Sequence, residues 1–289
     1  MTASGRGVLY PARLPTFHRL PAPSAVGDWV RWFWIPEWDV APGRVSRQHL
    51  VGFPAFNLVV EPSVVGLSGP TTRASHRDLT GRGWAVGALL RPAAVRGLLE
   101  CLGEPVPGDL SGWCDLYRPV AAPGLHRRVS GAMAAPVGQL GDAAESDRDA
   151  TDPSAERRQR AVDEFTDWLV SELPSPDEEA LLANRMFEVI DADSTVLRVE
   201  DVAAALAVSV RTVQRLARRY VGFTPAAMIR RRRLQEAAER LREHPDLDIA
   251  AVAAELGYSD HAHLSRDFRT VLGLPPSGYR SNAAVTERS

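Results

Sequence analysis

The 289-residue sequence predicts an α+β fold: a mixed, mainly β-stranded N-terminal domain, a helical linker, and an all-α C-terminal domain with two helix-turn-helix motifs. Three observations support this prediction. A helical module occurs twice near the C-terminus, aromatic and β-branched segments recur in the first half, and the two halves differ in charge. The first half is therefore expected to be sheet and the second half helix.

Strand patterns occur between Gly27 and Val60, where the segments WVRWFWI and FNLVV are apolar and bounded by Pro, Gly and Asp. Two more short strands are expected at 64–67 and 84–89. A short helix with a proline in its first turn is expected at 92–102. Together these elements predict a mixed β-rich domain over residues 1–137.

The middle of the chain is predicted to join the two domains. Residues 138–155 are small and acidic without an apolar period, which predicts a flexible linker. Apolar residues then recur at helical spacing over 156–176, which predicts a connecting helix before a helical domain over 177–283. This helix either packs internally or mediates dimerisation. Residues 284–289 are expected to be a disordered tail.

The repeated module is the most specific feature of the sequence. Its first copy, VEDVAAALAVSVRTVQRLARRYVG, covers residues 199–222, and its second, IAAVAAELGYSDHAHLSRDFRTVLG, covers 249–273. Val202 and Val252 are 50 residues apart, whereas Arg215 and Arg266 are 51 apart, so the second turn holds one extra residue. Each copy reads as a supporting helix, a tight turn and a second helix, which is a helix-turn-helix unit.

The second helix of each unit has a polar face suited to the major groove of DNA. Ser209 is expected to cap the first of these helices, and Ser259 or Asp260 the second. Arg can bind guanine and Gln can bind adenine through two hydrogen bonds, while Thr suits a phosphate or a base edge. The candidate DNA-binding residues are Arg211, Thr212, Gln214, Arg215 and Arg218 in the first unit, and His261, Ala262, Ser265, Arg266 and Arg269 in the second.

A long helix starting at Thr224 and Pro225 is expected to hold the two units relative to each other. Its arginine run, Arg230–Arg233, is expected to form a solvated or phosphate-facing surface. All 34 basic residues of the chain are arginine, and no lysine is present. Residues 195–283 hold 14 arginines against 10 acidic residues, whereas residues 1–194 hold 19 against 25. This asymmetry favours a DNA-binding second half.

The run from Ser194 to Tyr279 resembles the DNA-binding domain of the AraC/XylS transcription regulators, through SVRTVQRLARRYVGFTPAAMIRRRRLQEAAERL and ELGYSDHAHLSRDFRTVLGLPPSGY. The resemblance implies seven helices, with two recognition helices in successive major grooves, and control of transcription. Carried over position by position, it implies base contacts from Arg211, Gln214 and Arg215, and from His261, Ala262, Ser265 and Arg266. Double-stranded DNA is the implied partner, with RNA polymerase if the protein is an activator.

The N-terminal half resembles an uncharacterised sensor-like domain of such regulators, especially in actinobacteria, through FPAFNLVV, SGPTTR and GRGWAVGALLRPAAVRGLL. Two hypotheses are open for it. It senses a small-molecule effector, or it is a purely structural dimerisation or protein-interaction domain. The candidate pocket residues are Trp29, Trp32, Trp34, Trp38, His49 and Asn57. Core packing of the tryptophans is the favoured alternative for that cluster.

The two hypotheses predict different structures. A sensor requires an open pocket near Trp29–Trp38, whereas a dimerisation domain requires a filled core and an exposed apolar patch near Phe165, Trp168 or Phe187. An effector of unknown identity and a possible homodimer are both expected on these grounds.

Other functions find little support in the sequence. No phosphate-binding loop or nucleophile motif occurs, so we expect no enzyme and no cofactor. The histidines are widely spaced, which predicts no metal site. Cys101 and Cys114 are expected to be reduced, buried residues of a cytoplasmic protein. No apolar run is long enough to span a membrane, so no membrane partner is expected.

Overall fold

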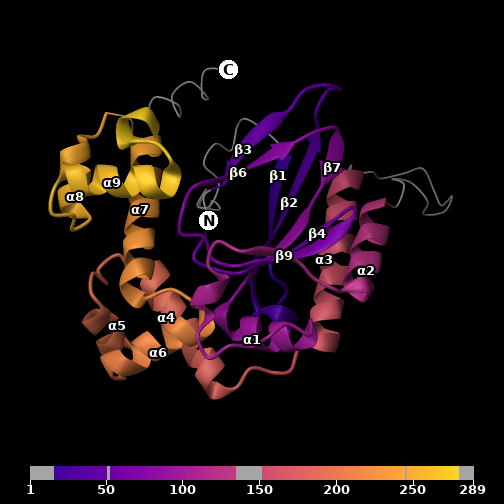
Figure 1. Cartoon of the computed structure of the whole chain (residues 1–289), viewed down its shortest axis with the longest axis horizontal. Coiled ribbons are helices and arrows are strands. Elements are labelled where there is room, and N and C mark those ends of the chain that lie inside the picture. The colour runs from indigo at the N-terminus through magenta and orange to yellow at the C-terminus, as the bar shows by residue number, and fades with distance from the viewer. Residues whose placement is uncertain (1–15, 51–52, 135–151, 245, 280–289) are drawn as a thin grey trace, which may run out of the picture.

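A computed structural model describes residues 16–50, 53–134, 152–244 and 246–279. An antiparallel sheet carries helices on one face and the helical second half on its other side (Figure 1). The predicted fold class is confirmed: strands dominate the first half and helices make up the second. We call β1–β9 with α1–α3 the β domain, and the helices from α4 onward the helical domain.

The main sheet has the order β1-β2-β8-β4-β5-β9, with β7 also paired to β2, and all its pairs are antiparallel. A separate hairpin pairs β3 with β6. The strands are β1 (Thr16–Pro21), β2 (Val30–Asp39), β3 (Ser46–Leu50), β4 (Asn57–Glu61), β5 (Val64–Ser68), β6 (Ser75–Leu79), β7 (Arg82–Trp84), β8 (Val86–Leu90) and β9 (Tyr117–Pro119).

The expected strand at 64–67 is confirmed, as are those of the segments WVRWFWI and FNLVV. The strand expected at 84–89 is divided, because Trp84 ends β7 and β8 begins at Val86. A register shift between Val30 and Trp32 interrupts the pairing of β2 with β8. An extra residue of this kind reverses the alternation of side chains. Val30, Phe33 and Ile35 are consequently all buried in the same core, although their spacing is irregular.

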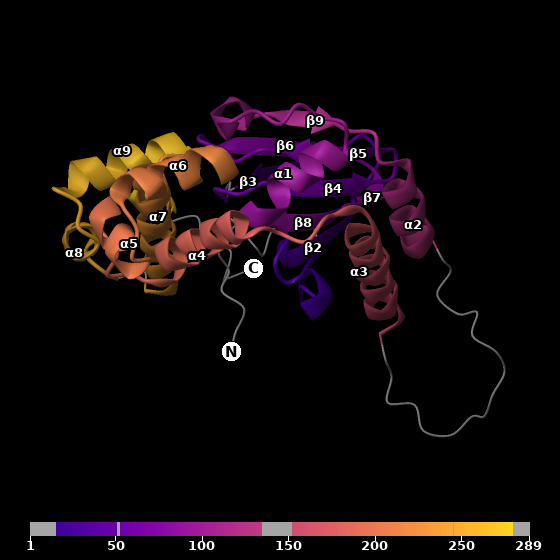
Figure 2. The same ribbon diagram turned by 90° about the horizontal axis from the view of Figure 1, so that it is seen from below.

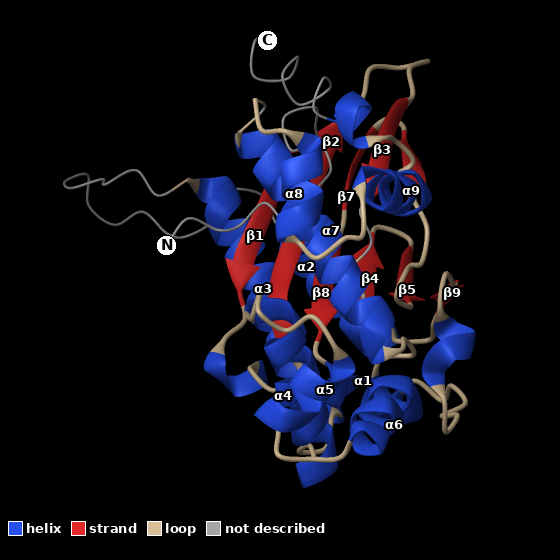
Figure 3. Cartoon of the chain, turned by 90° about the vertical axis from the view of Figure 1, so that its left-hand side faces the viewer, coloured by secondary structure: helices blue, strands red, loops and turns tan. Residues whose placement is uncertain are grey.

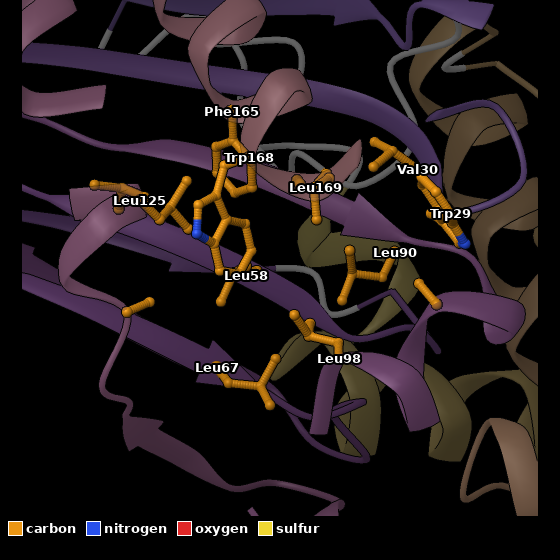
Figure 4. Close-up of a cluster of buried hydrophobic side chains, with 14 of the residues drawn as sticks. Trp29, Val30, Leu58, Leu67, Leu90, Leu98, Leu125, Phe165, Trp168 and Leu169 are labelled. Atoms are coloured by element: carbon orange, nitrogen blue, oxygen red, sulfur yellow. The ribbon is translucent and has the colours of Figure 1, made fainter. Parts of the chain in front are cut away.

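That core lies between the sheet and the helices α1 (Pro92–Cys101), α2 (Pro123–Ala134) and α3 (Pro153–Glu172). Figure 4 shows Phe165, Trp168 and Leu169 pointing toward Leu58 and Leu125. Burial of large apolar side chains of this kind contributes about 1.5–3 kcal/mol each to folding. The β domain thus has its own hydrophobic core.

The helix expected to connect the two domains, over 156–176, is α3, and it packs against the sheet instead. Its residues Phe165 and Leu169 are fully buried, because the apolar stripe matches the inner face of the sheet. The helix begins at Pro153, capped by Asp152, so residues 153–155 are helical rather than part of a linker. The rest of the predicted linker falls within 135–151, and the predicted tail within 280–289; both stretches lie outside the described residues.

The helical domain contains α4 (Glu178–Ala192), α5 (Val199–Ala205), α6 (Val210–Tyr220), α7 (Pro225–Glu243), α8 (Ile249–Glu255) and α9 (His261–Leu272). Residues 276–279 are also helical, which makes seven helical segments in the described part of this domain. Figure 2 shows this domain beside the sheet, at the end opposite α2 and α3. No helix in the described ranges is both long and apolar enough to cross a membrane.

Candidate nucleic-acid interface

The first helix-turn-helix unit, residues 199–222, consists of α5 and α6. The side chain of Ser209 accepts a hydrogen bond from the backbone N–H of Thr212 at 3.1 Å, so the predicted cap is confirmed. Val213, Leu216 and Ala217 are fully buried against the supporting helix, α4 and α7. Burial of this stripe determines which face of α6 remains exposed.

The exposed face of α6 brings most of the predicted contact residues together. Arg211, Gln214, Arg215 and Arg218 are exposed on it. Thr212 is half-buried, and its hydroxyl lies 2.9 Å from the hydroxyl of Ser209. The face therefore presents three guanidinium groups and one amide to solvent, while Thr212 takes part in the cap.

Glu179, at the start of α4, binds this face from the side. Its carboxylate accepts hydrogen bonds from Arg215 and, at 3.0 Å, from the hydroxyl of Tyr220, and Arg219 lies 3.3 Å away. Burial by itself raises the pKa of Glu179, but the hydrogen bonds from Arg215 and Tyr220 and the charges of both arginines lower the pKa below its usual value. Glu179 is thus ionised and partly neutralises the charge of Arg215, a predicted base-reading residue.

The second unit, residues 249–273, consists of α8 and α9. Asp260 caps α9, accepting from the backbone N–H of His263 at 2.7 Å. Gly257 has φ +71° in the turn, and Gly273 ends the helix at φ +75°. The cap and the tight turn match the sequence prediction, and Leu264 and Phe268 of α9 are fully buried.

The predicted contact residues of α9 are not all exposed. His261, Ala262, Arg266 and Arg269 face solvent. Ser265 is only 6% exposed, and its hydroxyl lies 3.5 Å from the ring nitrogen Nε2 of His261. In this structure Ser265 therefore supports the His261 side chain rather than standing beside it at the surface.

The arginine run of α7 was expected to form a solvated or phosphate-facing surface, and for Arg231 and Arg232 this expectation is wrong. Arg231 and Arg232 are only 4% and 5% exposed. Arg232 donates to the backbone oxygen of Val196 at 2.8 Å, which holds α7 against the segment before α5. Both guanidinium groups have a structural role, because backbone oxygens far along the chain accept their hydrogen bonds.

Arg231 crosses to the β domain. It donates to the backbone oxygen of Thr71 at 2.8 Å, and burial lowers its pKa to about 10, an effect partly offset by the charge of Asp115. Asp115 in turn accepts from the backbone N–H of Thr72 at 2.6 Å. The SGPTTR segment of the sequence therefore serves as the docking loop for α7.

The other two arginines of the run organise the second unit. Arg230 forms a two-pronged ion pair with Asp267 of α9, whose side chain is only 1% exposed. Hydrogen bonding to Asp267 raises the pKa of Arg230. Arg233 lies over the ring of Tyr258, 4.3 Å from its centroid. These contacts fix the recognition helix α9 relative to α7.

Both recognition helices point the same way. The C-terminal end of α6 meets the β domain where Cys114 Sγ lies 3.4 Å from the backbone oxygen of Gly222, and that of α9 where the backbone N–H of Ala74 lies 3.4 Å from the oxygen of Thr270. Their N-terminal turns are therefore directed away from the β domain. Figure 3 shows α6 and α9 nearly end-on, one near each end of α7, so they run in nearly the same direction.

Helix α4 carries an extended polar contact between the domains. The amide of buried Asn184 accepts from the backbone N–H of Ala93 at 2.9 Å and donates to the backbone oxygen of Asp28 at 2.8 Å. Asp191 and Glu188 form ion pairs with Arg31 and Arg91 of the β domain. One helix therefore contacts both the sheet and, through Glu179, the first recognition helix.

The predicted tryptophan pocket does not form as one site. Trp29 is 9% exposed in the core on the helix-covered face, and Trp38 is half-buried, its indole N–H 3.3 Å from the backbone oxygen of Thr80. Trp32 and Trp34 share the opposite face of β2. Trp32 packs edge-on against Phe53, with the ring centroids 5.3 Å apart.

Of the two remaining pocket candidates, Asn57 and His49, the structure describes the side chain of Asn57 alone. The amide oxygen of Asn57 accepts from the indole N–H of Trp34 at 3.0 Å, which satisfies both groups. The backbone of His49 pairs with His76 between β3 and β6, but its side chain lies outside the described residues. In this structure Trp29, Trp32 and Trp34 are packed against other apolar side chains, as the favoured alternative for the cluster predicts.

A small cleft lies at the domain boundary, beside α4. It has a volume of about 120 Å³ and is lined by residues of both domains, among them Arg31, Arg91, Asn184 and Asp191. Arg31 is stacked there over Trp32 and Phe53, at 4.7 and 5.4 Å from the ring centroids. The cleft is thus charged, and its arginines are already paired with carboxylates.

Sequence reasoning missed Glu179, Asn184 and Asp267. Each acts through partners remote in the chain, so no local pattern announces it. A usable signal existed for Asp267 alone, because an acidic residue on the apolar side of α9, between Leu264 and Phe268, requires a buried cationic partner.

Comparison with known families matches two stretches of the chain. Residues 202–282 match a helix-turn-helix domain family, and residues 18–103 match a domain of unknown function, DUF6597. The first match includes most of α5 and all of α6–α9, and the second includes β2–β8 and α1. The two matches therefore fall on the two domains of the structure.

Curated relatives match the C-terminal part. The transcriptional activator NphR of Rhodococcus sp. is 40% identical over 94 residues, which is 32% of this chain and 27% of that protein. A putative AraC-like transcription regulator of Streptomyces lividans is 37% identical over 87 residues, 30% and 28% of the two chains. The HTH-type transcriptional activator RhaS of Pectobacterium carotovorum is 35% identical over 77 residues, 27% of each chain.

The chain thus spans only 27–28% of the length of these three relatives. Among solved structures, an apo variant of ToxT from Vibrio cholerae superposes over 90% of this chain and 98% of its own, with a TM-score of 0.43 and 12% sequence identity.

Proposed function

Because this chain carries an AraC-type helix-turn-helix domain behind a DUF6597 domain, we propose that it is a sequence-specific DNA-binding regulator of transcription. The observation that carries the proposal is the pair of recognition helices, which present exposed arginines and point their N-terminal turns in one direction, away from the β domain. A helix of this kind reads bases from its N-terminal residues in the major groove.

In the proposed complex, Arg211, Gln214 and Arg215 read one major-groove segment of double-stranded DNA. His261 and Arg266 read the next segment, about 34 Å along the duplex, and Ala262 contacts a thymine methyl group. Thr212, Arg218 and Arg269 hold phosphates. Ser265 orients His261, in keeping with its burial.

The second part of the proposal is that the β domain controls DNA binding in response to a small-molecule effector. Support comes from α4, which contacts α1 and the segment before β2 through Asn184, and the first recognition helix through Glu179. A ligand that alters the charged cleft beside α4 shifts the same helix. At about 120 Å³ the cleft suits only a small polar ligand unless it opens.

The alternative is a structural dimerisation domain. It requires an exposed apolar patch near Phe165, Trp168 or Phe187, but these side chains are 0%, 6% and 6% exposed. This burial favours the regulatory role over the purely structural one. A homodimer and a contact with RNA polymerase stay predictions.

DNA binding is tested with the purified protein and fragments from its own genomic neighbourhood, at two salt concentrations. The double variant Arg211→Ala/Arg266→Ala removes one exposed arginine from each recognition helix. We expect the wild type to prefer one fragment and the variant to lose that preference, because each bidentate base contact contributes about 1–3 kcal/mol of discrimination.

The matched control is Arg44→Ala/Arg127→Ala, which removes the same charge from exposed β-domain positions that have no ion pair among the described residues. Equal loss of affinity in both double variants means that the recognition arginines act only through net charge. Equal, weak binding of the wild type to every fragment contradicts the proposed sequence-specific regulator. Effector sensing is tested by screening small molecules for a change in the Kd of the preferred fragment.

A further inference from the structure

A groove of about 400 Å³ separates the two helix-turn-helix units. One wall is the start of α5, the floor is α7, and the other wall is the second unit at Tyr258 and His263. The lining residues are Leu197, Arg198, Val199, Glu200, Ala226, Ile229, Arg230, Arg233, Tyr258 and His263. None of them was assigned to base reading, so the groove is a feature distinct from the two recognition faces.

The groove opens away from the β domain. Arg231 of α7 reaches the β domain, where it donates to the backbone oxygen of Thr71. An α-helix advances about 100° per residue, so Arg233 lies about 200° around the helix from Arg231 and Arg230 about 100° from it. Arg230 and Arg233 line the groove, so the groove lies on the far side of α7. That is also the side toward which the N-terminal turns of α6 and α9 point.

The groove is positively charged. Arg198, Arg230 and Arg233 line it against a single carboxylate, that of Glu200. Arg230 is neutralised by Asp267, but neither Arg198 nor Arg233 has an ion pair among the described side chains. Two guanidinium groups without an ion pair in the described part of the chain therefore face one concave surface, and they outnumber its single carboxylate.

Arg233 is also held in place. Its guanidinium lies over the Tyr258 ring at 4.3 Å, and its Nη2 atom is close to Gly257, where a β-carbon would lie 3.5 Å away. Tyr258 is itself only 5% exposed. A guanidinium that is already stacked on a buried ring loses little side-chain conformational entropy when it binds an anion. Arg233 is therefore suited to binding a phosphate.

From these observations we infer that the groove holds the sugar-phosphate backbone of the DNA segment that runs between the two major grooves. The inference rests on the proposed function. Arg198 and Arg233 each contact a phosphodiester oxygen, with His263 at the same wall. The contacts fix the register of the two recognition helices on the duplex and read no sequence.

A backbone segment fits better than a free small anion for a structural reason. Effector pockets enclose most of the ligand surface, whereas this groove is a gap between two units, open on the side that both recognition helices face. DNA lying along both recognition helices must cross it, since α7 places one unit on either side.

The test is the salt dependence of DNA binding by Arg198→Gln and Arg233→Gln, on the preferred fragment and on an unrelated one. Each variant is expected to bind both DNAs about five- to tenfold more weakly near 0.1 M salt. The negative slope of log K against log salt should become shallower by about 0.9 in each variant. Sequence preference stays at the wild-type ratio. Arg127→Gln, an exposed β-domain arginine, is the matched control and leaves the slope unchanged.

Two further measurements keep the outcomes separate. Arg233→Lys retains the charge and is expected to restore most of the slope, whereas a variant that is merely misfolded shows a lowered Tm. If wild type prefers one fragment and both Gln variants keep its full slope, the inference is overturned and the proposed function stands. If the variants bind DNA normally but lose a response to an added anion such as pyrophosphate, the groove is an effector site and the inference is likewise overturned. If wild type has no preferred fragment, the proposed function fails.

Discussion

At the scale of single residues, Arg215 serves two partners. Its guanidinium is a predicted base reader, yet in this structure it forms an ion pair with Glu179 of α4. DNA must therefore displace a carboxylate before Arg215 reaches a base. An ion pair at a half-exposed site contributes about 0–1 kcal/mol, so the competition tunes affinity without abolishing binding.

Replacing Glu179 by Gln is accordingly expected to strengthen DNA binding. Release of Arg215 and Arg219 lowers the Kd for the preferred fragment by up to about fivefold, the equivalent of about 1 kcal/mol. The measurement is a binding titration at constant salt. Glu178→Gln is the control, since it removes the same charge from the neighbouring exposed position. An equal gain in both variants indicates general electrostatics and contradicts a specific role for Glu179.

Residue-level chemistry explains which parts of the site were predictable. Ser209 and Asp260 cap their helices as expected, because capping depends on residues within one turn. Arg231 and Arg232 could not be placed from sequence. Their acceptors, on Thr71 and Val196, lie 160 and 36 residues away, and no local pattern distinguishes a buried arginine of this kind from a solvated one.

At the scale of elements, α4 belongs to both domains. Its apolar residues Ala183 and Met186 lie in a hydrophobic cluster with Phe53 and Leu89 of the β domain and with the core of the first unit. The sequence predicted that a helical domain begins at residue 177, but such a prediction gives no orientation for its first helix. The contacts that α4 makes depend on the positions of β2, α1 and α6, which are set by the whole fold.

Asn184 tests the importance of α4 as a link. Asn184→Ala leaves the N–H of Ala93 and the backbone oxygen of Asp28 without their buried partner. We expect the free energy of unfolding to fall by about 1–3 kcal/mol, measured by urea denaturation. Arg185→Ala, at the adjacent exposed position, should change it by less than about 0.5 kcal/mol. A loss from Asn184→Ala no larger than that of the control means that water replaces the amide.

On the scale of the whole molecule, the helical domain is attached to the β domain at the end of each recognition helix. Gly222 has φ +87°, and a β-carbon there would lie 2.6 Å from the backbone oxygen of Leu110. Gly273 has φ +75°, but a β-carbon there would meet only the side chain of Ala74, at 3.4 Å. The two glycines share the same backbone strain and differ in what surrounds them.

Alanine at these two positions therefore separates strain from docking. Gly273→Ala is expected to cost about 1–2 kcal/mol, the strain of a left-handed alanine. Gly222→Ala carries the same strain and also pushes α6 away from Leu110, so its loss should be larger and should expose the domain boundary. Urea denaturation gives the energies, and limited proteolysis reports the boundary. Equal losses with equal protease resistance would show that the short 3-10 helix Leu110–Trp113 moves aside without a measurable cost.

The double role of α4 also bears on how such regulators diversify. Recombination that joins a new β domain to this helical domain inherits α4 with the latter. The two hydrogen bonds of Asn184 use backbone atoms of the β domain, so they tolerate any side chain there. The ion pairs Arg31–Asp191 and Arg91–Glu188, by contrast, each require an arginine side chain from the β domain. An exchange that removes Arg31 or Arg91 loses that ion pair, and the loss should cost more at Asp191, whose side chain is 10% exposed, than at the exposed Glu188.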